Sequence, residues 1–110
     1  MESIRVAGVA DIPSGSMRQV VFGGEELLVA NVDGEFYAMA NTCSHRGNSL
    51  SNGTIQDGIV TCPRHGSMFD VRTGQNLEGP KILGKRFRTG NVRAYPVRVE
   101  GEDVLVGDAP

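Results

Sequence analysis

Cysteine and histidine, the residues that most often bind metals, are scarce in this sequence, which has two of each among 110 residues. Tryptophan is absent, and no run of about 18 apolar residues exists that could cross a bilayer as a helix. The formal net charge is only -2, so no excess of one sign indicates binding to nucleic acid or to an anionic membrane surface. We therefore expect a soluble protein with no membrane and no nucleic-acid partner.

Helical periodicity is also missing, because no window of a dozen residues keeps it without an intervening glycine or proline. Fifteen glycines instead divide the chain into short pieces, a rhythm typical of strands and turns. The length suits one domain and is too short for two well-packed ones. The sequence predicts a single all-β domain over residues 1–110.

The first clear strands form a predicted meander over residues 17–22, 26–32 and 35–40, with tight turns at Gly23-Gly24 and Asp33-Gly34. An Asp-Gly pair suits a two-residue hairpin because both central residues need a positive φ. A second such pair, Asp57-Gly58, lies further along the chain. Further strands are expected over residues 53–56, 59–62, 67–71, 92–100 and 103–107.

The opening residues 1–16 lack the basic start and the unbroken apolar stretch of an export signal, so we expect a cytoplasmic protein. Thiols are kept reduced in that compartment. Two cysteines there are more often metal ligands or redox groups than a structural disulfide. The composition therefore favours a metal site.

All the cysteine and histidine falls into two short blocks, Cys43-x-His45 and Cys62-x-x-His65. Each block follows a predicted strand, so two adjacent loops would each offer one thiolate and one imidazole to a shared metal centre. Zinc accepts such ligands, but common zinc fingers present a cysteine pair followed by a histidine pair. The interleaved order suits a two-iron, two-sulfide cluster in which one iron binds both thiolates and the other binds both imidazoles.

The segments CSHRGNSLSNG (43–53) and CPRHGSMFDVRTG (62–74) resemble the two cluster loops of Rieske-type ferredoxins and of the Rieske domains of oxygenases. The resemblance extends to Gly79-Pro80 and to the ending YPVRVEG (95–101), and so covers nearly the whole chain. It implies a Rieske-type fold of short antiparallel sheets with two cluster-binding hairpin loops and one [2Fe-2S] cluster. The implied metal ligands are Cys43 and Cys62 on the inner iron, with His45 and His65 on the outer iron. The other residues implied to lie close to the cluster are Gly47, Leu50, Gly66 and Pro80.

Two departures from the family pattern bear on the redox potential. Respiratory Rieske proteins carry an extra cysteine in each loop, and non-cysteine residues such as Arg64 stand there in this chain. High-potential members also resemble one another in a serine and a tyrosine that donate hydrogen bonds to sulfur. Ser67 matches the serine, but Phe69 replaces the tyrosine. We predict a potential in the lower part of the roughly -150 to +300 mV range of Rieske centres.

No histidine remains for the mononuclear iron that Rieske oxygenases need for O2 chemistry, so the chain is predicted not to be an enzyme and to have no catalytic residue. The resemblance implies a one-electron carrier. Such a ferredoxin takes electrons from a flavin-dependent NAD(P)H reductase and passes them to a terminal, aromatic-ring-hydroxylating oxygenase. Two alternatives are a small Rieske-fold subunit of an assimilatory nitrite reductase, which is a structural partner, and a zinc-binding module.

The segment from Pro80 to Tyr95 is longer than the resemblance leads us to expect, and it carries positive charges without an acid between residues 81 and 93. One hypothesis is a partner-specific insertion, and the plainer alternative is a solvated loop. For Arg46 and Arg64, beside the predicted ligands, one hypothesis is that they steer an acidic partner surface, and the plainer alternative is that they are solvated. The basic residues of the segment are Lys81, Lys85, Arg86, Arg88 and Arg93.

Overall fold

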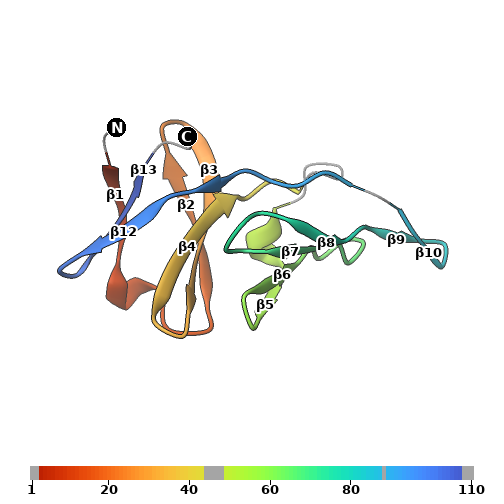
Figure 1. The fold of residues 1–110 in the computed structure, drawn as a ribbon, viewed down its shortest axis with the longest axis horizontal. Helices are drawn as coiled ribbons and strands as arrows, with labels where there is room; N and C mark the ends of the chain where they lie inside the picture. The colour runs from red at the N-terminus through yellow and green to blue at the C-terminus, as the bar shows by residue number, and fades with distance from the viewer. Residues whose placement is uncertain (1–2, 44–48, 88, 108–110) are drawn as a thin grey trace.

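A computed structural model describes residues 3–43, 49–87 and 89–107, and Figure 1 shows their arrangement. Within these ranges the chain forms strands and two single-turn 3-10 helices, and no α-helix. No helix among them is long and apolar enough to cross a membrane. The prediction of an all-β fold of short antiparallel sheets is confirmed.

The first two sheets make up one half of the molecule. One is three-stranded in the order β1-β13-β12, and the other is four-stranded in the order β11-β4-β3-β2. Their strands are β1 (Ser3–Gly8), β2 (Met17–Phe22), β3 (Glu25–Val32), β4 (Glu35–Ala40), β11 (Ala94–Tyr95), β12 (Val97–Glu100) and β13 (Asp103–Gly107). The 3-10 helix η1 (Val9–Asp11) follows β1. The predicted meander is present as β2, β3 and β4, which pair antiparallel in sequence order.

The other half is built from shorter strands (Figure 1). A four-stranded sheet has the order β5-β6-β7-β8, and a separate two-stranded hairpin pairs β9 with β10. These elements are η2 (Leu50–Asn52), β5 (Thr54–Gln56), β6 (Ile59–Thr61), β7 (Met68–Asp70), β8 (Asn76–Glu78), β9 (Lys81–Ile82) and β10 (Lys85–Arg86). Figure 1 places the β9-β10 hairpin at one extreme of a molecule with extents of 47 × 26 × 18 Å.

Strand β3 separates two cores because successive side chains of a strand point to opposite faces. Leu27 and Val29 pack into the first core, whereas Leu28 and Ala30 pack into the second. All four side chains are fully buried, which explains why the sequence shows a continuous apolar run here and no alternation. The four-stranded β11-β4-β3-β2 sheet is therefore covered on both faces.

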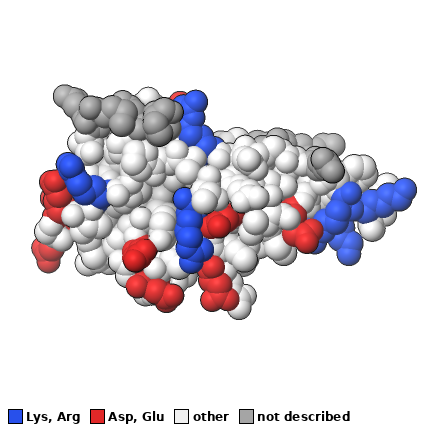
Figure 2. Space-filling model, viewed as in Figure 1, with Lys and Arg blue, Asp and Glu red and all other residues white. Residues whose placement is uncertain are grey.

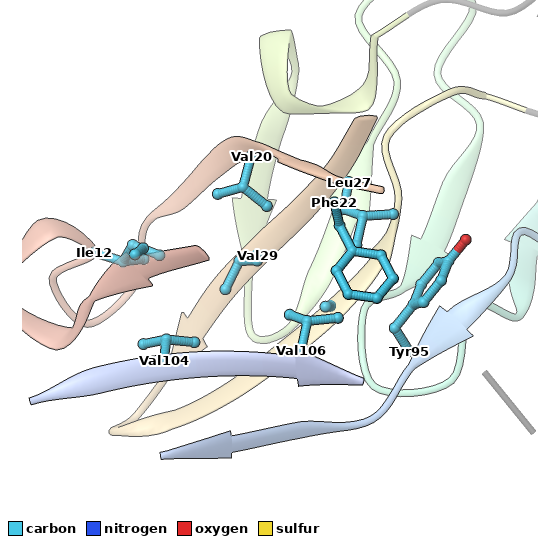
Figure 3. Close-up of a cluster of buried hydrophobic side chains, with 10 residues drawn as sticks. Ile12, Val20, Phe22, Leu27, Val29, Tyr95, Val104 and Val106 are labelled. Atoms are coloured by element: carbon cyan, nitrogen blue, oxygen red, sulfur yellow. The ribbon is translucent and has the colours of Figure 1, made fainter. Parts of the chain in front are cut away.

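The first core lies between the two sheets of the β1-containing half and is filled by aliphatic and aromatic side chains (Figure 3). The rings of Phe22 and Tyr95 meet edge to face, with their centroids 5.9 Å apart. The Tyr95 hydroxyl donates a 2.6 Å hydrogen bond to Oε2 of Glu25. This bond joins the C-terminal part of the chain to the start of β3.

The segment 92–100 departs from its prediction as one strand. Pro96 interrupts it, and the two pieces belong to different sheets, β11 beside β4 and β12 beside β13. Proline has no backbone N–H to donate to a sheet, so it marks the point at which the chain crosses from one sheet to the other. Strands β1, β8, β9 and β10 were not predicted at all.

Candidate functional site

The two cysteines of the predicted site lie at the ends of different sheets and meet the same core. Cys43 follows β4, and Cys62 follows β6. Their exposed fractions are 2% and 3%, and both belong to the second core. His65 is half-buried, nearer the surface than the cysteines. His45, together with Arg46 and Gly47, lies outside the described residues.

The loop after β6 is folded tightly by its own backbone. The Cys62 amide donates to the Ser67 carbonyl over 2.7 Å, and the Gly66 amide donates to the Cys62 carbonyl over 3.2 Å. Gly66 has a φ of 75°, a conformation that side chains with a Cβ rarely adopt. A Cβ there would meet only Nη1 of Arg86, at 3.7 Å. Gly66 is therefore required by the turn conformation and not by lack of space.

The other loop is closed at its base by Asn41, a residue that the sequence analysis missed. Its backbone carbonyl accepts a 2.7 Å hydrogen bond from the Leu50 amide, and its side-chain Oδ1 accepts a 2.8 Å bond from the Ser51 amide. An isolated bridge between Thr42 and Ser49 closes the same base. Asn41 is fully buried, and a polar residue two positions before a metal-binding motif was the only signal that could have found it.

The segment after β8 is held against the loop that carries His65. Pro80 is buried, and its carbonyl accepts a 2.9 Å hydrogen bond from the Phe87 amide. The Lys81 amide donates to the His65 carbonyl over 2.7 Å. The basic segment therefore begins in direct contact with the loop of a predicted ligand.

Arg86 lies on β10, the other strand of the hairpin, and connects this segment to the loop that carries His65. In the sequence it is only one charge of a basic run. Its Nη1 donates to the carbonyls of Gly66 and Gly79, over 3.1 and 2.8 Å. Its Nε lies 3.6 Å from Oε2 of Glu78. A planar guanidinium can make several such bonds at once, which a lysine ammonium in the same place would not reproduce.

Two buried polar atoms belong to residues close in sequence to the cysteines, and both are donors of the kind that iron-sulfur clusters accept hydrogen bonds from. Ser67 Oγ and Asn41 Nδ2 are buried, and neither has a hydrogen-bond partner among the described residues. A buried donor without a partner is costly, and sulfide or thiolate sulfur would accept from both. Buried cysteines, an adjacent histidine and spare donors together form a donor set suited to a cluster with thiolate and imidazole ligands.

The described residues do not by themselves complete a metal site. Among residues 3–43, 49–87 and 89–107, no three cysteine, histidine or acidic side chains gather as a metal ion would require. The remaining predicted ligand, His45, belongs to the part of the first loop that is not described. Cys43 and Cys62 are thus brought to one core, while the full set of four is a prediction.

Comparison with known proteins defines the class. The model of the Rieske [2Fe-2S] domain family matches residues 2–100, and the chain belongs to this family. Its cofactor is accordingly one Rieske-type [2Fe-2S] cluster.

Relatives place the chain among the ferredoxins of the family. It is 37% identical, over 96% of its length and 92% of the relative's, to the ferredoxin component of biphenyl 2,3-dioxygenase from Rhodococcus jostii (strain RHA1). It is 35% identical, over 94% of its length and 92% of the relative's, to the ferredoxin component of the naphthalene 1,2-dioxygenase system from Pseudomonas aeruginosa. The chain is an electron carrier and not an enzyme. The names of its relatives favour a dioxygenase ferredoxin over the nitrite reductase subunit, and the [2Fe-2S] cluster of the family argues against the zinc-binding module.

Solved structures agree with this placement. The ferredoxin of carbazole 1,9a-dioxygenase from Nocardioides aromaticivorans IC177 superposes with a TM-score of 0.83 at 30% identity, covering 96% of this chain and 97% of that one. A ferredoxin in a complex of reduced oxygenase and oxidised ferredoxin of carbazole 1,9a-dioxygenase gives a TM-score of 0.82 at 32% identity, with 94% and 91% covered. The predicted Rieske-type fold is confirmed.

Proposed function

We propose that residues 1–110 form a single Rieske domain in which Cys43 and Cys62 bind the inner iron, and His45 and His65 bind the outer iron. The observation that carries this assignment is the contrast in burial between two cysteines in one core and His65 closer to the surface. Thiolates buried among apolar side chains are protected from solvent. Imidazoles nearer the surface offer a short path to a partner.

The bound cluster supplies reversible one-electron transfer. The chain's own residues position the cluster. Hydrogen bonds within the turn 62–67 fix the loop after β6, and Asn41 fixes the base of the loop after β4. Ser67 Oγ offers a hydrogen bond to sulfur. As a ligand of the outer iron, the half-buried His65 would pass the electron toward a docked protein.

We further propose that the protein carries electrons in the cytoplasm from a flavin-dependent NAD(P)H reductase to a terminal oxygenase that hydroxylates aromatic rings. The names of its relatives support this role, since they are ferredoxin components of naphthalene and biphenyl dioxygenase systems. The solved complex of a similar ferredoxin with its oxygenase supports direct docking of the two proteins.

Low-temperature electron paramagnetic resonance tests the ligand assignment. The dithionite-reduced protein is expected to give a rhombic signal with the low average g value of a histidine-ligated cluster, with two irons and two sulfides per chain. The His65→Cys variant would move the signal toward that of an all-cysteine cluster. An unchanged signal in that variant would contradict the role of His65.

The redox potential is a separate prediction. Phe69 is fully buried and has no hydroxyl to donate to sulfur, so the midpoint potential is expected in the lower part of the Rieske range. A redox titration of the wild-type protein measures it. A clearly positive midpoint would contradict the prediction.

A further inference from the structure

The β9-β10 hairpin, residues 81–87, ends in an unusual turn, and we call this hairpin the arm. Its two central residues, Leu83 and Gly84, have φ angles of 53° and 80°. The turns at Asp33-Gly34 and Asp57-Gly58 have the same pair of positive φ values, 53° and 92° in one and 54° and 79° in the other. Aspartate tolerates the left-handed conformation, whereas leucine adopts it only with strain. The chain thus places a leucine where it twice uses aspartate.

Leu83 is also almost fully exposed: 98% of its surface is accessible, more than that of any other exposed large apolar residue in the described part of the chain. Phe87, at the base of the arm, is 50% exposed. An apolar side chain in this position gains nothing from the fold of its own chain, and it adds backbone strain. Both costs are explained if Leu83 becomes buried against another protein.

The charges of the arm indicate what kind of surface that is. Residues 81–87 contain three basic residues and no acid, and Figure 2 shows basic side chains gathered at this end of the molecule. Arg86 is engaged with Glu78 and the loop carbonyls. The side chains of Lys81 and Lys85 form no ion pair with any described residue. They remain available to carboxylates of a partner.

The base of the arm contacts the loop of His65, the proposed outer-iron ligand from which electrons would pass to a partner. Lys81 donates its amide to the His65 carbonyl, and Arg86 holds the carbonyl of the next residue, Gly66. A protein bound to the arm would therefore be held next to His65. Because electron transfer needs close approach, a docking element at this place serves the carrier function directly.

We propose that the arm docks into the terminal oxygenase, which receives Leu83 in an apolar pocket and surrounds it with carboxylates that pair with Lys81 and Lys85. This inference rests on the proposed function, since it names the surface by which that partner is recognised. A few side chains that become fully buried supply most of the affinity at protein interfaces, and Leu83 is the arm's candidate for such a contact. The surrounding charges speed the encounter and make it sensitive to salt.

The sharpest test is the Leu83→Asn variant, because asparagine suits the left-handed turn position and leaves the net charge unchanged. The variant is expected to be at least as resistant to heat as the wild type. Its second-order rate for reducing the terminal oxygenase is expected to fall about tenfold or more, the loss that follows from removing one buried leucine from an interface. The probe is a ring-hydroxylating terminal oxygenase that the wild-type protein is first shown to reduce.

Matched variants separate the anchor from general effects. Val21→Thr removes an apolar side chain that is 67% exposed on β2, and Arg18→Gln removes a charge from the same strand; both are expected to transfer electrons at the wild-type rate. The Lys81→Gln/Lys85→Gln double variant is expected to weaken the salt dependence of the rate. Oxidation by ferricyanide, which needs no docking pocket, monitors the cluster.

The possible outcomes are distinct. If Leu83→Asn reduces the oxygenase as fast as the wild type does, the docking role is overturned. It is also overturned if the variant is slowed only in accepting electrons from the reductase. A slower reaction of the variant with ferricyanide would overturn it as well, because that reaction needs no docking. An equal loss in Val21→Thr would also overturn it, because the effect would not be specific to the arm. If the wild-type protein reduces no ring-hydroxylating oxygenase, the proposed function itself fails and the inference fails with it.

Discussion

The two faces of β3 belong to cores that are built differently. The face with Leu27 and Val29 packs against the sheet of β1, β12 and β13, whose strands have four to six residues, and its hydrophobic cluster contains neither cysteine. The face with Leu28 and Ala30 packs toward strands of three residues, and its core includes both cysteines. One strand thus supports a scaffold on one side and the cluster region on the other.

This difference indicates how the molecule is stabilised. We call the half built from β1 to β4 and β11 to β13 the scaffold half, and the half built from β5 to β10 the cluster half. The scaffold half has long hydrogen-bonded ladders and a continuous apolar core. The cluster half has short ladders and depends on loop hydrogen bonds, on the contacts of Arg86 and on its cofactor. Stability is therefore expected to be uneven along the chain, with the cluster half opening more readily.

The strongest way to test the comparison is Cys62→Ser. A serine hydroxyl is a poor substitute for an iron-binding thiolate, so the variant is expected to lose nearly all iron, sulfide and visible colour. Circular dichroism should still show the β-sheet signal of the scaffold half. Retention of a full cluster would contradict the assignment of Cys62, and complete unfolding would contradict the independence of the scaffold.

Leu27→Ala and Leu28→Ala form a matched pair, because both side chains are fully buried and they point to opposite faces. Each variant is expected to lose about 3 kcal/mol of unfolding free energy, as buried leucine truncations do. Only Leu28→Ala should also speed cluster loss, measured as bleaching in the presence of a chelator. Equal bleaching rates in the two variants would show that the two cores are not separate.

Arg86→Gln tests the hydrogen bonds by which the arm holds the loop that follows β6. Removing the guanidinium leaves the carbonyls of Gly66 and Gly79 without their shared donor. Because these bonds are exposed and water can replace them, only about 0.5 to 1 kcal/mol of stability should be lost. Hydrogen exchange at the amides of residues 65–67 should become faster. Arg86→Lys keeps the charge but not the fork, so a wild-type result there would show that charge alone matters.

Tyr95→Phe changes the scaffold half only. The pKa of Tyr95 is raised above its usual value of about 10, with burial as the largest cause and the hydrogen bond to Glu25 as the second. The neutral hydroxyl therefore stabilises the fold below pH 10, and this contribution is lost as the pH rises through the raised pKa. The variant is expected to be less stable by about 1 kcal/mol at pH 7, with a difference that shrinks in denaturant titrations above pH 10. A constant difference at all pH values would exclude this linkage.

Ser67→Ala is expected to have the smallest effect on folding and a specific effect on the cluster. Its hydroxyl has no hydrogen-bond partner among the described residues, so removal should barely change the stability of the cluster-free protein. If the hydroxyl donates to sulfur, its loss should lower the midpoint potential by roughly 40 mV, the equivalent of about 1 kcal/mol for one electron. An unchanged potential would mean that Ser67 does not contact the cluster.

Local sequence signals predicted the parts of the molecule that depend on local chemistry. The Asp-Gly pairs mark hairpin turns because aspartate and glycine accept positive φ, and β2, β3 and β4 lie where the alternating or apolar runs predicted them. The hairpin at Leu83-Gly84 escaped prediction because leucine is atypical of such a turn. Strand β1 escaped because its pairing partner, β13, lies at the other end of the chain.

The sequence by itself determined the class of site and its chemistry, since two spaced Cys-His blocks limit the possible metal centres to very few. It also determined the all-β character, because glycine spacing leaves no room for helices. Only the tertiary structure decided which face of β3 meets the cysteines, that Asn41 closes a loop and that Arg86 joins the arm to the loop of His65. These features depend on contacts between residues far apart in the chain, and no local preference encodes them.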